Sequence, residues 1–151
     1  MEVLNKPAAA VEKPKPKPAG VYVAMIQGMP KQKKINVQGE EKNVLSFTCK
    51  PLMAREVDDQ DALKSQPEVN TWPPQTKDFW IDDEQGEYAL KQFLQHTLGI
   101  DPGPANKSKT LGQMCAEAPG KQLLTTYENY PYQSKEGQME IGTRIKATAA
   151  I

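Results

Sequence analysis

Residues 21–26, VYVAMI, place side chains alternately on two sides of the chain, which is the period of two that a β-strand requires. A second alternating stretch covers residues 44–54, and Pro51 marks a bulge or an edge in it. The polar residues 31–43 connect the two stretches, and Gly39 offers the positive φ of a hairpin turn. The pattern predicts two antiparallel strands joined by this connection.

The alternation is lost over residues 55–77, where acidic residues and a Trp-Pro-Pro sequence at 72–74 replace it. This stretch is too long for a simple hairpin. We therefore expect an acidic excursion out of the sheet, with a short helical turn at residues 61–65. Residues 78–81, DFWI, predict a short and mostly buried third strand.

Residues 82–101 show the clearest helical pattern. Their apolar side chains recur at the spacing of one helix face, and they are Leu90, Phe93, Leu94 and Leu98. Asp82 or Asp83 can cap the start of the helix, and Gly99 favours a left-handed conformation at its end. We expect this helix to pack its apolar face on the sheet.

A shorter helix follows from its cap Thr110 to Ala118, and residues 121–132 and 137–149 then alternate as two strands joined by a short turn. This order predicts a mainly β protein with helices, of the α+β class. More narrowly, it predicts an OB-like five-stranded antiparallel barrel, with one amphipathic helix and one short helix between strands three and four.

Residues 1–19 contain a stretch of alternating lysine and proline at 13–18 and few large apolar side chains. Proline at every second position favours extended polyproline II over helix or sheet, so we expect a basic, flexible tail. The tail is interpreted as a solvated linker. The alternatives are a tether for a polyanion and an arm that docks on a neighbour. Residues 20–151 are predicted to form a single OB-like domain, with its acidic excursion at about 55–77.

The net charge of zero is the sum of an acidic segment and a basic remainder of the chain. Between Glu56 and Glu87, ten acidic residues accompany only Lys64 and Lys77, so the rest of the chain is basic. Nucleic-acid binding remains open, because a binding face needs only a local positive field. The acidic segment is interpreted as solubilising, with recruitment of a partner as the alternative.

The sequence predicts a cytoplasmic protein without a membrane association. It has no apolar leader and no run near the roughly 18 apolar residues of a membrane span. Cys49 and Cys115 stand in no metal-binding spacing, and we expect both thiols to be reduced and buried, with a disulfide as the less favoured alternative.

The sequence points away from an enzyme. His96 is the only histidine, and there is no P-loop, dinucleotide glycine motif or nucleophile elbow. Carboxylates cluster at residues 58–61 and 82–84, but such clusters on loops are mostly solvated. We therefore expect no catalytic residue, no metal and no cofactor.

Three stretches carry a resemblance to a known family: residues 19–28 (AGVYVAMIQG), 79–101 (FWIDDEQGEYALKQFLQHTLGID), and 118–130 together with 137–145. Over about residues 19–148 the chain resembles small phage-encoded proteins related to single-stranded DNA-binding proteins. The resemblance implies an OB-like barrel that coats single strands during phage DNA replication or recombination, in the cytoplasm of the infected bacterial host. Candidate partners besides DNA are further copies of the chain and phage or host replication or recombination proteins.

Binding of single strands without a sequence code needs aromatic rings on which bases stack and cations along the phosphates. The candidate rings are Tyr127, Tyr130 and Tyr132, and the candidate cations are Lys31, Lys33, Lys34, Lys135, Arg144 and Lys146. Strand alternation puts Tyr130 and Tyr132 on one side and Tyr127 on the other, unless Pro131 introduces a bulge. The alternative for each tyrosine is a buried place in the sheet, and Trp72 and Trp80 are expected to be core residues or loop anchors.

The sequence thus predicts a non-enzymatic protein that binds single-stranded DNA independently of sequence. The alternative function is a structural or interaction protein, such as a phage virion or assembly component, whose N-terminal arm docks on a neighbour.

Overall fold

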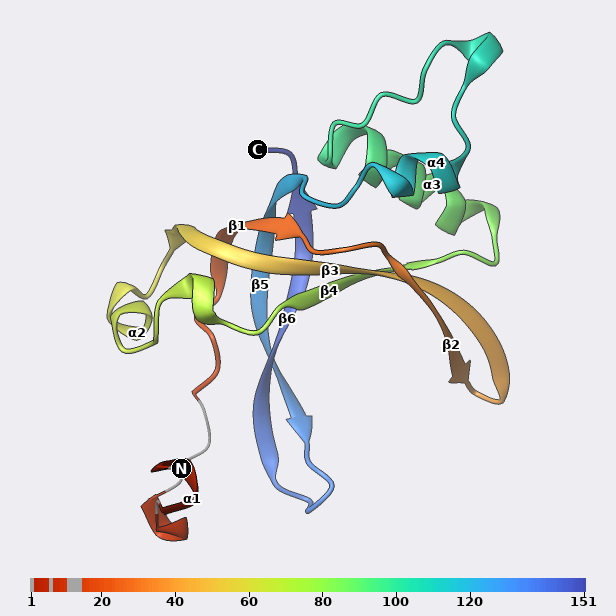
Figure 1. Cartoon of the computed structure of the whole chain (residues 1–151). Coiled ribbons are helices and arrows are strands. Elements are labelled where there is room, and N and C mark those ends of the chain that lie inside the picture. Colours follow the sequence, from red (N-terminus) through yellow and green to blue (C-terminus); the bar gives the residue numbers. More distant parts are fainter. Residues whose placement is uncertain (1, 6, 11–14) are drawn as a thin grey trace.

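The computed structural model describes residues 2–5, 7–10 and 15–151, and one antiparallel β-sheet forms its centre (Figure 1). The strands are β1 (Gly20–Ile26), β2 (Lys31–Val37), β3 (Glu40–Val57), β4 (Gln75–Trp80), β5 (Gln122–Gln133) and β6 (Met139–Ala149). They lie in the order β2-β3-β1-β5-β6, and β4 pairs with β3. The chain is therefore mainly antiparallel β with a few helices, as predicted. The sheet has six strands instead of five and is not closed into a barrel in the part of the chain described.

The additional strand is β2, which occupies the stretch expected to be a polar connection. Residues 31–36 are all exposed, so no hydrophobic alternation marked them as a strand. Their pairing with the start of β3, from Lys31 opposite Ser46 to Val37 opposite Glu40, creates the strand. The predicted hairpin turn is confirmed, because Gly39 has a φ of 84° and Gln38 a φ of 52°.

The predicted pairing of the first two alternating stretches is confirmed, because β1 runs antiparallel to β3. Ala24 lies opposite Pro51 while Val23 lies opposite Met53, so the register shifts by one residue beside the proline. This is the bulge that Pro51 predicted. Because β3 continues to Val57, the segment outside the sheet is shorter than expected and begins at residue 58.

The helical segments are short. They are α1 (Glu2–Asn5), α2 (Gln60–Lys64), α3 (Glu84–Gln92) and α4 (Leu111–Ala116), the 3-10 turns η1 (Ala8–Ala10), η2 (Val69–Thr71) and η4 (Ala105–Lys107), and the π-helical turn η3 (Phe93–Thr97). The two predicted caps are confirmed: the Asp83 carboxylate accepts from the N–H of Gly86, and Thr110 forms a capping box with Gln113. Gly99 ends the helix with a φ of 70°.

The described part of the tail departs from the expected polyproline-like chain. Helical turns α1 and η1 occupy residues 2–5 and 8–10, and residues 11–14 of the Lys-Pro run lie outside the described residues. Lys17 is held by the domain: its N–H donates to Thr143 Oγ1 at 3.2 Å and its Nζ to Gln66 Oε1 at 3.0 Å. The end of the tail therefore belongs to the folded unit.

Two apolar clusters fill the inner side of the sheet. The larger lies under α3, η3 and α4 and includes Phe47, Phe79, Phe93, Leu94 and Leu123. The smaller lies at the other end and consists of Tyr22, Val57, Trp72 and Tyr127. The helical face predicted from Leu90, Phe93, Leu94 and Leu98 is confirmed, since these side chains are at most 5% exposed.

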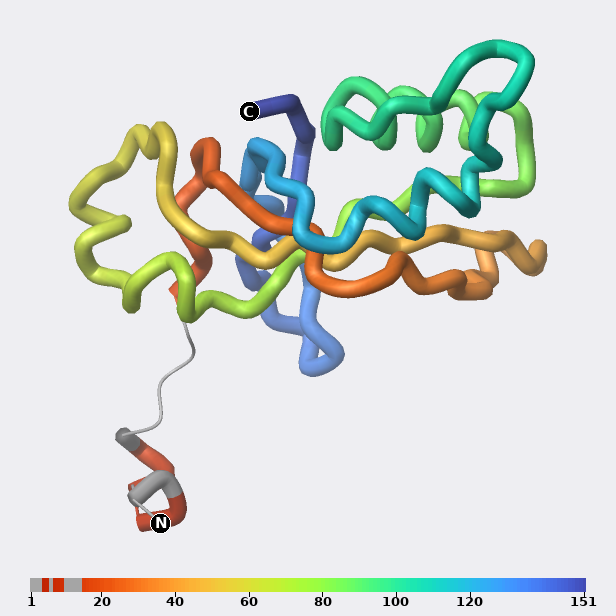
Figure 2. The backbone as a smooth tube through the Cα atoms, turned by 45° about the horizontal axis from the view of Figure 1, so that its top comes forward, coloured from red at the N-terminus to blue at the C-terminus, as the bar shows by residue number. Residues whose placement is uncertain are grey.

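Two hairpins extend beyond these clusters as arms (Figures 1 and 2). The β2–β3 arm, residues 31–46, points to the right in Figure 1, and the β5–β6 arm, residues 128–144, points down. β1 pairs with β5 only as far as Tyr127, so the β5–β6 arm is a two-stranded ribbon beyond that point. The predicted site residues lie on these two arms, except for Tyr127 and Lys146, which belong to the parts of β5 and β6 nearer the core.

Candidate nucleic-acid interface

Tyr127 is a core residue. Its ring packs against Tyr22, at a centroid distance of 4.7 Å, and is 2% exposed. Burial raises the pKa of its hydroxyl well above the ordinary value. The prediction of Tyr127 as a stacking residue is therefore wrong for this fold, because the strand alternation turns its ring into the smaller cluster and no base can reach it.

Tyr130 and Tyr132 lie together on the opposite side of the β5–β6 arm, as the alternation predicted. Their ring centroids are 5.9 Å apart, Tyr132 is 39% exposed, and Tyr130 is partly buried. Pro131 keeps its place in the ladder opposite Ile141, so it introduces no bulge. The two rings form a pair on the surface.

The surface around this pair, which we call the tyrosine face, consists of Glu128, Tyr130, Tyr132, Glu140, Gly142 and Arg144. The Arg144 guanidinium lies over the Tyr130 ring, 4.4 Å from its centroid, and its Nε donates to Glu128 at 2.6 Å. The Tyr132 hydroxyl donates to Glu140 at 2.8 Å. The arrangement holds both rings in place, but it also puts two carboxylates, Glu128 and Glu140, on the same face as the guanidinium of Arg144.

Gly142 is the reason that Tyr130 can lie flat across the arm. It stands opposite Tyr130 in the ladder, and a Cβ on Gly142 would come within 2.8 to 2.9 Å of the tyrosine ring. Only a residue without a side chain leaves this space free. The ring therefore reaches over β6 towards the edge of the sheet.

The three lysines of β2 do not share one side of the sheet. Residues directly opposite in an antiparallel ladder point to the same side. Lys33, Val44 and Trp80 form one such row across β2, β3 and β4, and Lys31, Ser46 and Asp78 form the next. Lys34 alternates to the reverse side, with Asn43 opposite it. Lys31 and Lys33 therefore lie on the same side of the sheet, and Lys34 faces away from them.

Trp80 belongs to the same side as Lys31 and Lys33, and this surface is called the Trp80 face. The ring is 45% exposed, and Lys42 Nζ lies 5.5 Å from its centroid. The expectation of a buried position is confirmed for Trp72, which is 1% exposed, and is wrong for Trp80. Phe79 points into the core, and the alternation of the strand therefore turns its neighbour Trp80 outward.

Acidic residues limit the positive charge on one flank of Trp80. A hollow of about 320 Å³ beside the ring is lined by Glu40, Glu41, Lys42, Asp82 and Asp83. Asp82 accepts the backbone N–H of Asn43 at 2.7 Å and its side-chain amide at 2.8 Å, which lowers the pKa of the carboxyl. Asp78 accepts from Ser46 Oγ at 2.5 Å. The positive side of the Trp80 face is therefore the side of Lys31 and Lys33.

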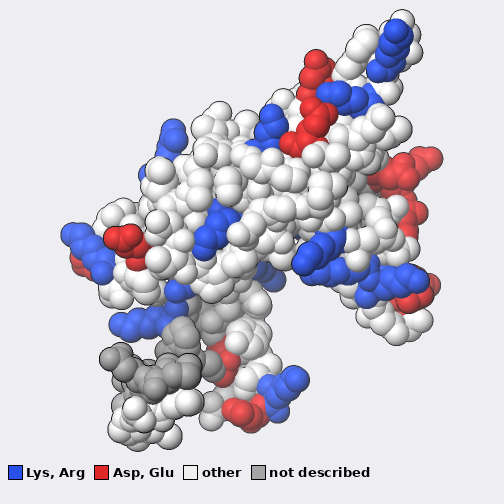
Figure 3. Space-filling view, viewed as in Figure 1, with Lys and Arg blue, Asp and Glu red and all other residues white. Residues whose placement is uncertain are grey.

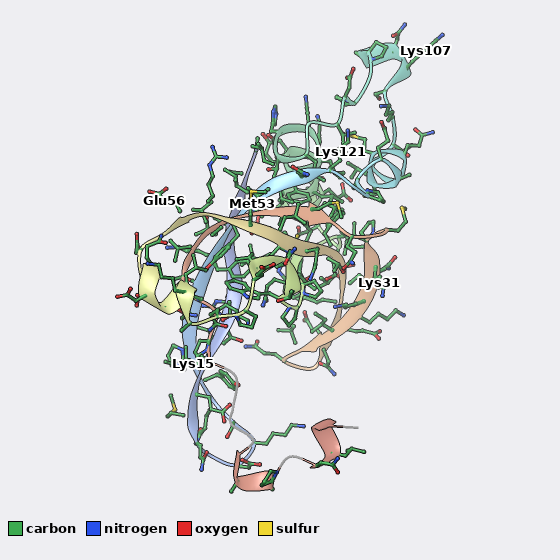
Figure 4. The ribbon with its side chains drawn as sticks, turned by 60° about the vertical axis from the view of Figure 1, so that its left-hand side comes forward. Lys15, Lys31, Met53, Glu56, Lys107 and Lys121 are labelled. Carbon is green, nitrogen blue, oxygen red and sulfur yellow. The ribbon has the colours of Figure 1, made fainter. Side chains whose placement is uncertain are left out.

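Figure 3 shows lysines and arginines, in blue, gathered over the root and near side of the β2–β3 arm, while acidic side chains gather at the outer right edge. Lys31 stands on this arm, and Lys15 lies across the molecule, beside the β5–β6 arm (Figure 4). The remaining predicted cations are separate from both aromatic faces: Lys135 is exposed in the turn of the β5–β6 arm, and Lys146 is exposed at the bulge of β6.

A hollow of about 680 Å³ lies between α3 and the loop before α4 and contains none of the predicted site residues. Its charged lining residues are of both signs, Glu84, Glu87, Lys91 and Lys109. Within the described residues no three His, Cys, Asp or Glu side chains come together as a metal site, and no helix has the length and apolar character to cross a membrane.

Comparison of the chain with protein-family models and with curated proteins yields no match in either set. The resemblance to phage single-strand binders therefore stays a prediction, and the geometry of the two arms carries the functional argument.

Proposed function

We propose that this protein binds single-stranded DNA independently of sequence, through exposed aromatic rings and the cations beside them. The observation that carries the proposal is Trp80, a large apolar ring left 45% exposed on a sheet face with Lys42 over it and Lys33 in its row. Every base has a flat face that can stack on such a ring, and lysines next to it can contact the phosphates. Tyr130 with Arg144 repeats this pairing of ring and cation on the second arm.

The strand order supports an OB-like reading of the fold. Without β2, the remaining strands lie in the order β4-β3-β1-β5-β6, which is the neighbour order of an OB-type Greek-key barrel opened between its third and fifth strands. A hollow of about 340 Å³ is lined by Lys77 and Phe79 of β4 and by Thr148 of β6, so these two strands, which do not pair with each other, come near each other below η3.

In OB domains the outer face of strands two and three and the loops between strands one and two and between four and five bind oligonucleotides. The corresponding parts of this chain are the outer side of β3 and β4, which carries Trp80, and the β2–β3 and β5–β6 arms. The resemblance to phage single-strand binders adds the biological setting, which is DNA replication or recombination in an infected bacterium.

The alternative, an interaction protein that docks through its N-terminal arm, gains no support from the described residues. Lys17 donates to Thr143 and Gln66, and Asn129 Nδ2 donates to the carbonyl of Lys17 at 2.9 Å, so the end of the arm is bound to its own domain.

The test is the fluorescence anisotropy of a labelled oligo-dT titrated with the protein at low and high salt. Trp80→Ala is expected to weaken binding by a factor between about 5 and 150, the equivalent of the roughly 1 to 3 kcal/mol that stacking contributes per base. Tyr88→Ala is the matched control, because Tyr88 is 63% exposed on α3 and lies outside both faces.

Two neighbouring lysines provide the control for charge. Lys33→Ala is expected to reduce the slope of log K against log salt by roughly 0.7, the value for one phosphate contact with a single strand, whereas Lys34→Ala leaves the slope unchanged. Absence of binding at low salt would refute the proposal. If the two lysine substitutions change the slope equally, the Trp80 face is not the binding surface.

A further inference from the structure

β6 is a long edge strand without a second partner. In the described part of the chain, Met139–Ala149 pairs with β5 alone, and no backbone hydrogen bond joins its outer edge to another segment. It contains no proline, and Met139 and Ile141 are 70% and 58% exposed. An unprotected edge of this length is a template for pairing with another strand.

The other edges of the sheet are less suited to pairing. β2 carries Lys31, Lys33 and Lys34, and lysines on an edge oppose the approach of a second lysine-rich strand. β4 has only six residues and lies beside α3. β6 differs from both, because it carries one acidic residue, Glu140, and two basic residues, Arg144 and Lys146, between smaller and apolar ones.

The sequence of β6 is complementary to itself in one antiparallel register. If Gly142 lies opposite Gly142 of a second copy, Glu140 lies opposite Arg144, Ile141 opposite Thr143, and Met139 opposite Ile145. Opposite charges then face each other on one side of the sheet, while on the other side Met139 faces the apolar Ile145 and Ile141 faces Thr143. A register centred on Arg144 would instead oppose two guanidinium groups.

A bulge in β6 limits the length of the stretch that can pair with a second copy. Tyr127 lies opposite Ile145 and Thr126 opposite Ala147, so Lys146 is an extra residue in β6 and interrupts its regular pleat. The register centred on Gly142 uses residues 139–145 and stops before this bulge. A register centred on Thr143 would have to pass through it.

The symmetry of the pairing determines which faces of the two copies lie side by side. A twofold axis that pairs an edge strand with its own copy in antiparallel stands perpendicular to the sheet, so both copies present the same face on the same side. The Tyr130 ring already lies over Gly142, next to the axis. The two tyrosine faces therefore meet across the pair of glycines.

We propose that the protein forms a homodimer through antiparallel pairing of β6 with β6 of a second copy, centred on Gly142. The pairing turns two projecting two-stranded ribbons into one four-stranded sheet, which is more stable than an isolated hairpin. It covers Met139 and Ile141 on one side. On the other side it joins two Tyr130–Tyr132 pairs into a row of four rings.

Disulfide cross-linking tests the register directly. Ile141→Cys and Thr143→Cys proteins are prepared separately and oxidised mildly, alone and as a mixture. The proposal predicts a covalent dimer in the mixture and none with either protein alone, because residue 141 faces residue 143 of the other copy. The native Cys49 and Cys115 are buried, so they do not compete. Lys107→Cys, in the exposed loop far from β6, is the control for cross-links formed by random collision (Figure 4).

Sedimentation equilibrium of the unchanged chain gives an independent measure, with an expected mass of twice 16.8 kDa. A monomeric mass at the concentrations used for cross-linking overturns the proposal. A covalent dimer from Ile141→Cys alone or from Thr143→Cys alone overturns the Gly142 register. Both measurements are made without DNA, so the dimer can be refuted or supported independently of the proposed DNA binding. Only the use of the four rings as one stacking surface rests on that function.

Discussion

The two tryptophans differ so strongly in environment that we expect their replacement by alanine to lower the stability by very different amounts. Trp72 is 1% exposed, and its ring packs against Tyr22 at a centroid distance of 5.2 Å. Its Nε1–H donates to the carbonyl of Pro67 at 2.9 Å, and Lys17 Nζ lies 5.1 Å above the ring. Trp80 is 45% exposed and makes its main contact with Lys42.

Trp72→Ala removes the largest side chain of the smaller cluster. Truncation of a buried aromatic residue costs about 3 to 5 kcal/mol, and the lost hydrogen bond adds about 1 kcal/mol. The total is a large share of the roughly 5 to 15 kcal/mol by which a domain is stable. At about 2 to 4 °C per kcal/mol for a chain of this size, we expect the melting temperature to fall by roughly 8 to 24 °C.

Trp80→Ala is expected to lower the free energy of unfolding by no more than about 1 kcal/mol, because water already reaches nearly half of the ring. Urea unfolding followed by circular dichroism measures both variants without the use of tryptophan fluorescence. The expected result is a large fall of the midpoint for Trp72→Ala with an unchanged slope, and a small fall for Trp80→Ala. Equal losses in the two variants would refute the division into an inner and an outer tryptophan.

Three further predictions concern single positions. Gly142→Ala pushes the end of the Tyr130 ring away from β6, so it should lower the free energy of unfolding by no more than about 1 kcal/mol and shift the Tyr130 ring resonances; unchanged resonances would contradict the contact. Thr110→Ala removes the capping box of α4 and should cost about 1 kcal/mol, while Thr76→Ala on β4, which is exposed and caps no helix, should cost less. Burial raises the pKa of Cys49 to about 12 from an ordinary value of 9.0, so the thiol ionises first in the unfolded chain. Its contribution to stability is complete below pH 9 and is lost between pH 9 and 12, and Cys49→Ala should show a shallower alkaline decline in urea midpoint than the unchanged chain.

Local signals were sufficient for the elements that bury one regular face. The stripe from Leu90 to Leu98 located the long helix, because a period of 3.6 residues has no other structural explanation over that length. The two caps, the Gly39 turn and the bulge at Pro51 followed equally from residues whose backbone preferences are strong. The opposite orientation of Tyr127 and Tyr130 needed only the period of two.

The strand β2 and the exposure of Trp80 could not be predicted from local sequence patterns. β2 has no buried face, so its sequence carries no alternation, and it exists because β3 is long enough to pair with it. Trp80 is a large apolar residue of the kind that usually lies in a core. It lies on the surface because it follows the buried Phe79 in the strand and shares its row of the sheet with Lys33.

The sequence by itself determined the class of the fold, the positions of most helices and strands, and which tyrosines share a side, because these depend on contacts within a few residues. The tertiary structure alone decided that the sheet stays open, that Lys33 and Lys34 point to different sides of the molecule, and that Trp80 stands beside the lysines of another strand. These arrangements depend on the pairing register between segments far apart in the chain, such as Val44 with Trp80, and the free energy of that pairing is not contained in any local pattern.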